Sequence, residues 1–445
     1  MKDIKKKVEF FTFYDKTGIE KHLEQMASEG WLLEKMSAFR WTYRRIEPKK
    51  IHFSVSYYAT VTDFEPEPTE QQQAFNEFCE HSGWKLATQT VQMQVFYNEN
   101  ENPVPIETDP MLEIENIHIS VKKTVLVTYF LMLFLGFIMG ASFISTMLGD
   151  PILLLSSSIR LFTGIWFIVA LVYSLTELIT YFTWRRKAKK LAEQGVFLET
   201  RGHRKLGFAI VVFMLVSVVL YLISLANTGL QFYMTAYLLI LLAGFPLVNG
   251  VKSFLKKKKV KAGTNKALTF AASFTLAFVL MGALTAVTIL GIRNGAFESD
   301  LKELPFTIGE LLDVDDSDYL KTRGKEDSII LGQYRSSQHP NNYEHSPTMQ
   351  YTITEVKMPF LYDFVADTLY HHYDEWKGWD STYEYKETDA TSWGASKAWE
   401  LYRNGEPDNA FLVCYDKYIL EISADWEFTE EQMRMIGEKL NSSAQ

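Results

Sequence analysis

Glu177 is the residue whose type and position most clearly call for a chemical explanation. It is the one clear acid within an apolar run long enough to cross a bilayer, about two turns before Trp184. A carboxylate in hydrocarbon is costly, so its side chain should face other helices or a wet cavity rather than lipid. One interpretation is a proton, cation or coupling site. The other, which we favour, is a protonated or locally hydrogen-bonded glutamate with a structural role.

Two clusters near the C-terminus contain residue types that bind metals. The first is a run of acids that could ligate a hard cation: Asp313, Asp315, Asp316 and Asp318. It lacks the glycine and the distant glutamate of an EF-hand loop, so we expect a solvated acidic turn. The second lies on a predicted helix and comprises Asp367, His371, His372 and Asp374. No second ligand pair follows at a suitable spacing, and the sequence predicts no metal site there.

Five tryptophans are many for one small domain and could line a ligand groove: Trp376, Trp379, Trp393, Trp399 and Trp426. Packing in a core is the interpretation that we favour for them. Near the N-terminus, His22, His52 and His81 have no ligand spacing, and no phosphate-binding loop, HExxH motif or nucleophile elbow is present. Because no region combines an acid, a base and a nucleophile, we expect neither enzymatic activity nor a cofactor.

These candidate residues lie in three regions of different composition. The chain has 445 residues and a net charge of −9. Its charged flanks, 1–118 and 293–445, read as globular domains, whereas 119–292 is strongly apolar. The C-terminal flank alone carries about 30 acids against about 14 bases. Nucleic-acid binding needs a basic face, so we exclude it.

The apolar region predicts a bundle of five membrane spans, since about 20 apolar residues cross a bilayer. They are 125–147, 161–182, 207–226, 232–251 and 267–291. Basic residues precede the first span and fill the loops after the second and fourth, whereas the other two loops hold one and none. This bias places the N-terminus in the cytoplasm and the C-terminal domain outside. We interpret Lys256, Lys257, Lys258 and Lys259 as topology anchors at the inner face, rather than a lipid or nucleic-acid site.

Small residues and cysteines add two constraints. Gly136 and Gly140 in the first span would allow close helix packing, either within one chain or in a homodimer. Cys79 and Cys414 fall on opposite sides of the predicted membrane, so they cannot form a disulfide. The basic N-terminus has too short an apolar stretch for a signal peptide, so the first domain should stay in the cytoplasm.

Both flanks read as α+β domains. In the N-terminal domain, a pattern of a helix followed by strands occurs twice. Each helix ends at a Gly-Trp pair, and the two pairs, Gly30-Trp31 and Gly83-Trp84, lie 53 positions apart. The predicted elements are helices 17–29 and 70–81 and strands 39–45, 51–60 and 91–97. Two similar helix–strand units result, for which a ferredoxin-like arrangement is one option. In the C-terminal domain we predict strands 328–334, 350–356, 398–402, 410–415 and 418–424 and helices 361–376 and 429–440.

The N-terminal flank also resembles a known family. Residues 8–110 carry the segments FFTFYDKTGIEKHLEQMASEGWLLEK, FRWTYRRIEPKKIHFSVSYY and EFCEHSGWKL. They are similar to the family called domain of unknown function 2812. This resemblance implies the cell membrane of a low-GC Gram-positive bacterium and an association with PadR-like regulators. It implies no activity and no site residues.

The function that best fits these patterns is a non-enzymatic sensor or coupling protein. Its external domain would bind a signal or partner, and its cytoplasmic domain would bind a regulator or a transporter. An accessory subunit of a transporter or envelope-maintenance complex is the alternative. A transporter in its own right is less favoured, because several interacting polar residues would be needed in the spans and only Glu177 stands out.

Overall fold

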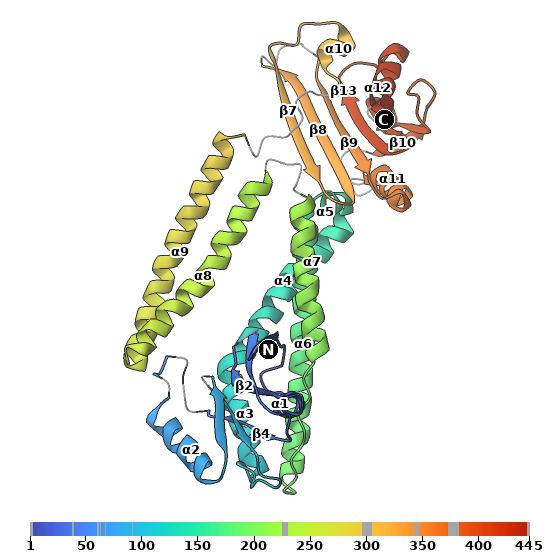
Figure 1. Cartoon of the computed structure of the whole chain (residues 1–445). Helices are drawn as coiled ribbons and strands as arrows, with labels where there is room; N and C mark the ends of the chain where they lie inside the picture. Colours follow the sequence, from blue (N-terminus) through green and yellow to red (C-terminus); the bar gives the residue numbers. More distant parts are fainter. Residues whose placement is uncertain are drawn as a thin grey trace. The chain divides into compact units, whose positions relative to one another are not determined.

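The computed structural model describes residues 3–37, 40–59, 62, 64–66, 68–90, 92–224, 230–295, 305–341, 347–372 and 382–442 (Figure 1). The chain forms two compact units. Unit 1 comprises Met1–Gly140, Trp166–Val218 and Thr235–Val287. Unit 2 comprises Ala141–Ile165, Val219–Met234 and Thr288–Gln445. The N-terminal domain lies in unit 1 and the C-terminal domain in unit 2.

The N-terminal domain consists of two β-α-β-β repeats with the same strand order. The first repeat contains β1 (Ile4–Val8), α1 (Lys16–Ser28), β2 (Trp31–Lys35) and β3 (Arg40–Arg45). The second contains β4 (His52–Tyr57), α2 (Glu70–His81), β5 (Lys85–Gln89) and β6 (Met93–Asn98). The sheets have the orders β1-β3-β2 and β4-β6-β5, and all pairs are antiparallel. The third strand of each repeat therefore lies at the centre of its own sheet.

Local sequence signals recur at matching places in the two repeats. Asp15 caps α1, and Thr69 caps α2 in a capping box with Gln72. Gly30 and Gly83 follow the helices with φ of 85°, a conformation that glycine adopts without steric cost. The next strand then has a register shift, between Leu33 and Lys35 in β2 and between Leu86 and Thr88 in β5.

The prediction of a repeated α+β unit is confirmed, but the ferredoxin-like arrangement is wrong. That fold needs one shared four-stranded sheet, and here each repeat keeps its own three-stranded sheet. The strands β1, β2 and β5 were not predicted, and the sequence of β1, Ile-Lys-Lys-Lys-Val, shows no apolar alternation. Its pairing with β3 closes the first sheet without any strand from the second repeat.

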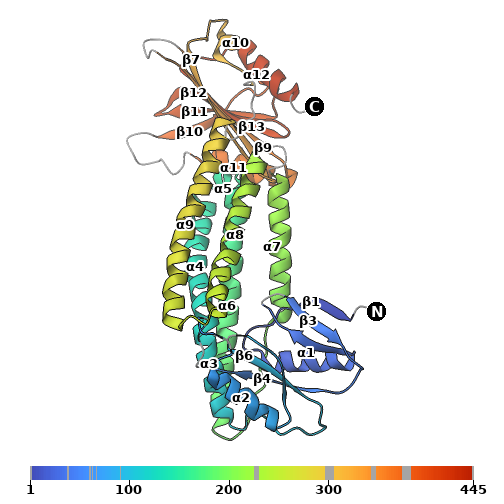
Figure 2. The same cartoon turned by 60° about the vertical axis from the view of Figure 1, so that its left-hand side comes forward.

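Within the described residues, five helices are long and apolar enough to span a membrane, as the sequence predicted. The first begins outside the predicted span: α3 (Pro110–Val121), the π-helix η1 (Lys122–Leu126) and α4 (Val127–Gly149) form one run of 40 residues (Figure 2). The others are α6 (Ser158–Ala192), α7 (Arg204–Ser224), α8 (Leu230–Lys257) and α9 (Ala262–Arg293). At 35 residues, α6 exceeds the roughly 20 that a crossing requires.

Glycines bring α4 and α6 together. A Cβ on Gly136 would lie 2.9 Å from both the Leu171 Cβ and the Phe167 carbonyl oxygen, and one on Gly140 would contact Ile168 at 3.5 Å. Both glycines are buried. The small-residue stripe of α4 thus lies against α6 of the same chain, where it permits close backbone approach.

The C-terminal domain is built on a seven-stranded antiparallel sheet with the order β10-β11-β12-β13-β9-β8-β7 (Figure 1). Its strands are β7 (Tyr319–Asp327), β8 (Leu331–Pro340), β9 (Met349–Val356), β10 (Tyr383–Glu387), β11 (Lys397–Arg403), β12 (Glu406–Cys414) and β13 (Tyr418–Ala424). The five predicted strands correspond to β8, β9, β11, β12 and β13. The edge strands β7 and β10 were missed, because charged residues interrupt their alternation.

Short helices cover this sheet on both faces. One hydrophobic core lies between the sheet and the helices α10 (Ile308–Leu312) and α12 (Glu430–Ser442). A second core, on the other face, includes α5 (Pro151–Leu155) and α11 (Tyr362–Tyr370). Because α5 lies in the connection between α4 and α6, the C-terminal domain packs directly on a loop between two membrane helices.

The α4–α6 contact yields a matched pair of substitutions. Gly136→Leu should overpack the contact and cost about 1–3 kcal/mol of stability. Gly250→Leu on α8 is the control, because a Cβ there meets nothing within 4 Å. Thermal unfolding of the full chain in detergent should show a lower midpoint for Gly136→Leu only. Equal midpoints would contradict this packing.

Candidate functional site

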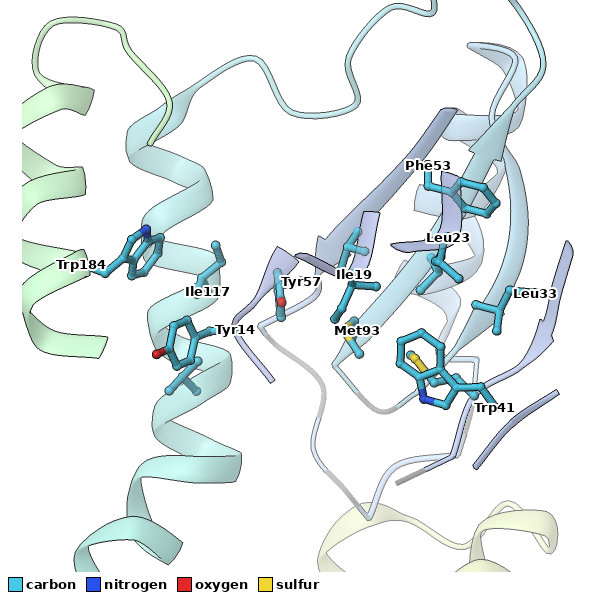
Figure 3. Close-up of a cluster of buried hydrophobic side chains, with 14 of the residues drawn as sticks. Tyr14, Ile19, Leu23, Leu33, Trp41, Phe53, Tyr57, Met93, Ile117 and Trp184 are labelled. Carbon is cyan, nitrogen blue, oxygen red and sulfur yellow. The ribbon is translucent and has the colours of Figure 1, made fainter. Parts of the chain in front are cut away.

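The N-terminal domain and the membrane helices share one hydrophobic core. Buried side chains from α1 and both sheets join Ile114 and Ile117 of α3 and the last turns of α6. The ring of Tyr14, which is 1% exposed, lies 5.1 Å from that of Tyr181 and 6.0 Å from that of Trp184. Figure 3 shows Tyr14 beside Ile117 and Trp184. The segment between β1 and α1 is therefore held against α6 rather than lying free in solvent.

A buried carboxylate lies at the start of this segment. Glu9 forms ion pairs with Arg204, at the first position of α7, and with Lys7 at 3.1 Å. Its Oε1 also lies 2.9 Å from Nε2 of His22, and the Tyr43 hydroxyl lies 3.4 Å from the same nitrogen. Burial lowers the pKa of His22, and the Glu9 charge opposes this shift. A buried charge requires partners of this kind, so Glu9 connects the domain to α7.

Asp15 ends the segment and performs two tasks. Its carboxylate caps α1 by accepting from the Gly18 N–H at 3.2 Å, and it also accepts from the Thr200 hydroxyl at 3.3 Å. Thr17 and Thr200 then exchange hydrogen bonds between backbone N–H and hydroxyl, at 2.8 and 3.0 Å. Burial raises the pKa of Asp15, while bonds from the Gly18 and Gly202 N–H groups oppose the shift. The α6–α7 connection is thus bonded to the first turn of α1.

Gly202 permits this close approach. A Cβ at this position would lie 2.8 Å from both Asp15 Oδ2 and the Thr12 hydroxyl oxygen. Any larger residue would push the connection away from the N-terminal domain. Gly202 is therefore required by the contact itself.

Glu177 lies where the membrane helices meet this contact. Its side chain is fully buried, and its Oε1 lies 3.3 Å from Nδ1 of His203. Its Oε2 has no hydrogen-bond partner among the described residues. The next residue, Leu178, already belongs to the core shared with the N-terminal domain. The sequence offered no basic partner for Glu177 within the spans, and the structure supplies one from the α6–α7 connection.

We call this set of side chains the junction cluster: Glu9, Asp15, His22, Glu177, His203 and Arg204. It joins three chain segments far apart in sequence and contains both acids and bases. Among the described residues, no group of three or more His, Cys, Asp or Glu side chains is placed to hold a metal ion. The junction cluster can hold the N-terminal domain on α6 and α7. The strength of this contact depends on the charges of the cluster residues.

Sequence reasoning identified only Glu177 in this cluster. Two signals pointed to the rest: Thr12 and Asp15 interrupt an aromatic run, and the polar stretch Arg201–Arg204 directly precedes an apolar helix. Neither signal reveals that the two segments meet, because 183 residues separate Thr17 from Thr200.

The other candidate residues are dispersed. Lys256 and Lys257 end α8, and Lys258 and Lys259 lie in the turn that follows. Trp393 and Trp426 belong to the core under α12, whereas Trp399 packs in the core on the opposite face, so these three do not line one groove. Trp376, Trp379 and Asp374 lie outside the described residues.

The two acidic clusters form local contacts. Asp315 accepts from the Ser317 N–H at 3.0 Å, and Asp316 pairs with Lys321 at 2.8 Å, in the turn between α10 and β7. Asp367 and His371 lie 3.3 Å apart on the exposed side of α11.

Comparison with known proteins identifies the first domain. Residues 15–130 match the family model described as Protein of unknown function (DUF2812). Residues 15–130 are thus similar to this family, and for this similarity we call the N-terminal domain the DUF2812 domain. The match begins at the cap of α1 and continues past residue 110, through α3 and into α4, so it includes helix residues of the shared core. No curated protein and no solved structure matches the chain.

The junction cluster predicts a difference in coupling between two ion pairs. A double-mutant cycle with Glu9→Gln and Arg204→Gln should give a coupling energy of about 1–3 kcal/mol, because Glu9 is fully buried. The control pair is Lys21–Glu199, which joins the same two segments at 2.8 Å but is 61% and 58% exposed. It should show no measurable coupling. Denaturant unfolding of the full chain supplies the values, and equal coupling in both pairs would contradict the role assigned to burial.

Proposed function

We propose that this chain is a non-enzymatic coupling protein of the cell membrane. It links binding at an external C-terminal domain to the state of a cytoplasmic, protein-binding N-terminal domain. The observation that carries the proposal is the shared core around Tyr14, which ties the DUF2812 domain to α6. Coupling between two domains needs a continuous physical connection that contacts a domain at each of its ends. A packed helix can provide such a connection.

Contacts within unit 2 attach the C-terminal domain to the beginning of α6. The Ser328 hydroxyl donates to the Leu155 carbonyl oxygen at 2.5 Å, and the Ser158 hydroxyl donates to the Asp327 carbonyl oxygen at 3.1 Å. Arg160 pairs with Glu326 at 3.2 Å. The C-terminal sheet thus binds α5 and the first turn of α6. Since α6 is one uninterrupted helix, a change at its first turn can reach the segment that carries Glu177.

The orientation rests on basic residues at helix ends. Lysines and arginines lie in the last turns of α6 and end α8. Because successive spans cross in opposite directions, these helix ends fall on the same side of the membrane as the N-terminal domain. The positive-inside rule therefore favours a cytoplasmic N-terminal domain and an external C-terminal domain. On that side, a PadR-like regulator or a transporter is the class of partner that we propose for the DUF2812 domain.

An accessory subunit of a transporter or envelope-maintenance complex is the alternative. It is favoured by the apolar surface of α8, where Leu239, Leu241 and Leu242 are each at least 60% exposed. Such a surface suits a second membrane protein, a second copy of this chain or lipid. In that case α8 would be the recognition element, and the DUF2812 domain would serve stability.

Hydrogen exchange of the full chain in nanodiscs separates these roles. Leu155→Ala removes a buried side chain from the core under α5. If the protein couples its two domains, exchange should increase in the last turns of α6 and in residues 9–17. Phe360→Ala is the control, because Phe360 is 79% exposed on the same domain and should change neither segment. Unchanged exchange in both segments, with β9 and β13 still protected, would reject coupling and favour the accessory subunit.

A further inference from the structure

One face of the C-terminal sheet is only half covered. Near α5 and α11 its side chains are apolar, as in Ile419 of β13 and Val356 of β9. Farther along the same strands they become small and polar, with Glu421 and Ser423 on β13 and Thr352 on β9. The residues share this face because they alternate at a period of two. The change from apolar to polar side chains therefore occurs at the same position along neighbouring strands.

This polar half of the face is hollow. A cavity of about 500 Å³ lies over β7, β8, β9, β13 and β12. It shares Ser337, Gln350 and Ser423 with a second cavity of about 510 Å³ towards the ends of the strands. It shares Arg335, Thr352 and Glu421 with a third, of about 610 Å³, beside α5 and α11. The three form one trough, whose size is in the range of ligand sites.

Small side chains create the trough. Gly324 and Ala410 line its floor at positions where a solvated sheet face ordinarily carries larger polar residues. Five strands spaced about 4.8 Å apart give a length near 19 Å across them. A ligand that fills it is elongated, with several units, rather than a single small molecule.

The lining offers hydrogen bonds of both kinds and carries charges of both signs. Hydroxyls of Ser337, Thr352 and Ser423 and the amide of Gln350 can donate and accept. The guanidinium of Arg335 donates to Gln333 at 2.5 Å. Burial raises the pKa of Glu421 to about 7, with the Arg335 charge opposing the shift. The centre of the trough carries Arg323, Arg335 and Glu421, whereas its two ends carry Asp150, Asp367, Asp408 and Asp425. Because arginines at the centre and acids at the ends leave no continuous strip of one sign, a polyanion or a polycation that spans the trough is disfavoured.

The position of the trough excludes two common partners. A peptide that adds a strand needs a free sheet edge, and the trough lies over the sheet face. An amphipathic helix needs a continuous apolar groove, and here polar and charged side chains such as Ser337, Thr352 and Glu421 interrupt the apolar surface. Chains of hydroxyls and amides remain. Tyr385 at the rim supplies a ring, itself stacked on Tyr370 at 5.6 Å, against which an apolar sugar face can pack.

We propose that the trough binds a linear, neutral oligosaccharide that carries hydroxyl and amide groups. Ser337, Gln350, Thr352 and Ser423 hydrogen-bond to it, and Arg335 and Glu421 fix its direction. The third cavity brings the ligand next to α5, which connects α4 to α6. The role of this ligand as the external signal rests on the proposed coupling function. Its binding to the trough does not depend on that function.

Isothermal titration of the full chain in nanodiscs with a linear N-acetylglucosamine tetramer tests the assignment. Saturable binding is expected, with at least about tenfold loss of affinity for Ser423→Trp, which fills the trough, and for Gln350→Ala, whose site is exposed and tolerant. Glu438→Trp is the control, because Glu438 is 74% exposed on α12 and should bind like the wild type. No saturation up to roughly 10 mM, equal binding by all variants, or equal competition by dextran sulfate would overturn the proposal.

Two further outcomes separate this inference from the function. One outcome is that the tetramer binds, Ser423→Trp abolishes this binding, and the bound tetramer leaves hydrogen exchange in the last turns of α6 unchanged. In that case the binding site is supported and coupling is rejected. If the tetramer does not bind, yet Leu155→Ala alters exchange in those turns, coupling stands and the ligand class is wrong.

Discussion

The fold of unit 1 depends on the burial of charged groups where a soluble domain meets membrane helices. Glu9 and Glu177 are both removed from water, and each finds its basic partner in the α6–α7 connection, in Arg204 and His203. Arg204 and His203 are 42% and 36% exposed, so loss of either would remove part of the compensation of a buried carboxylate and weaken the contact. The domain therefore cannot separate from α6 and α7 without exposing Tyr14 and Trp184 and rehydrating these carboxylates. This constraint makes the domain and the helices one structural body.

Each repeat of the DUF2812 domain uses the same connection for this contact. In the first, the segment between β1 and α1 carries Glu9 and Asp15 to α6 and α7. In the second, the segment between β4 and α2 reaches α9, where buried Asn265 donates to the Phe64 carbonyl oxygen at 2.9 Å. The two repeats share a topology but differ in burial, since Trp84 packs in a small separate core whereas its counterpart Trp31 packs against the shared one. Duplication of a β-α-β-β unit thus supplies two points of attachment to membrane helices.

Much of this architecture follows from local sequence. Apolar length predicts the five spans, and Gly30 and Gly83 predict the ends of two helices, because both signals act within a few residues. The strand β1 was invisible since its three lysines lie between Ile4 and Val8, and only pairing with β3 makes it a strand. The partner of Glu177 was invisible for the same reason. His203 lies 26 residues away, outside every predicted span, and only the turn between α6 and α7 brings it to the carboxylate. In the C-terminal domain, Trp393 and Trp426 pack in one hydrophobic core and Trp399 in another.

We infer that the DUF2812 domain and the last turns of α6 form one cooperative unit. Native-state hydrogen exchange of the full chain in nanodiscs, followed over increasing denaturant, measures this directly. We expect residues 178–192 of α6 to lose protection at the same denaturant concentration as β3 and β6. Protection of residues 178–192 that persists after both sheets have unfolded would contradict it.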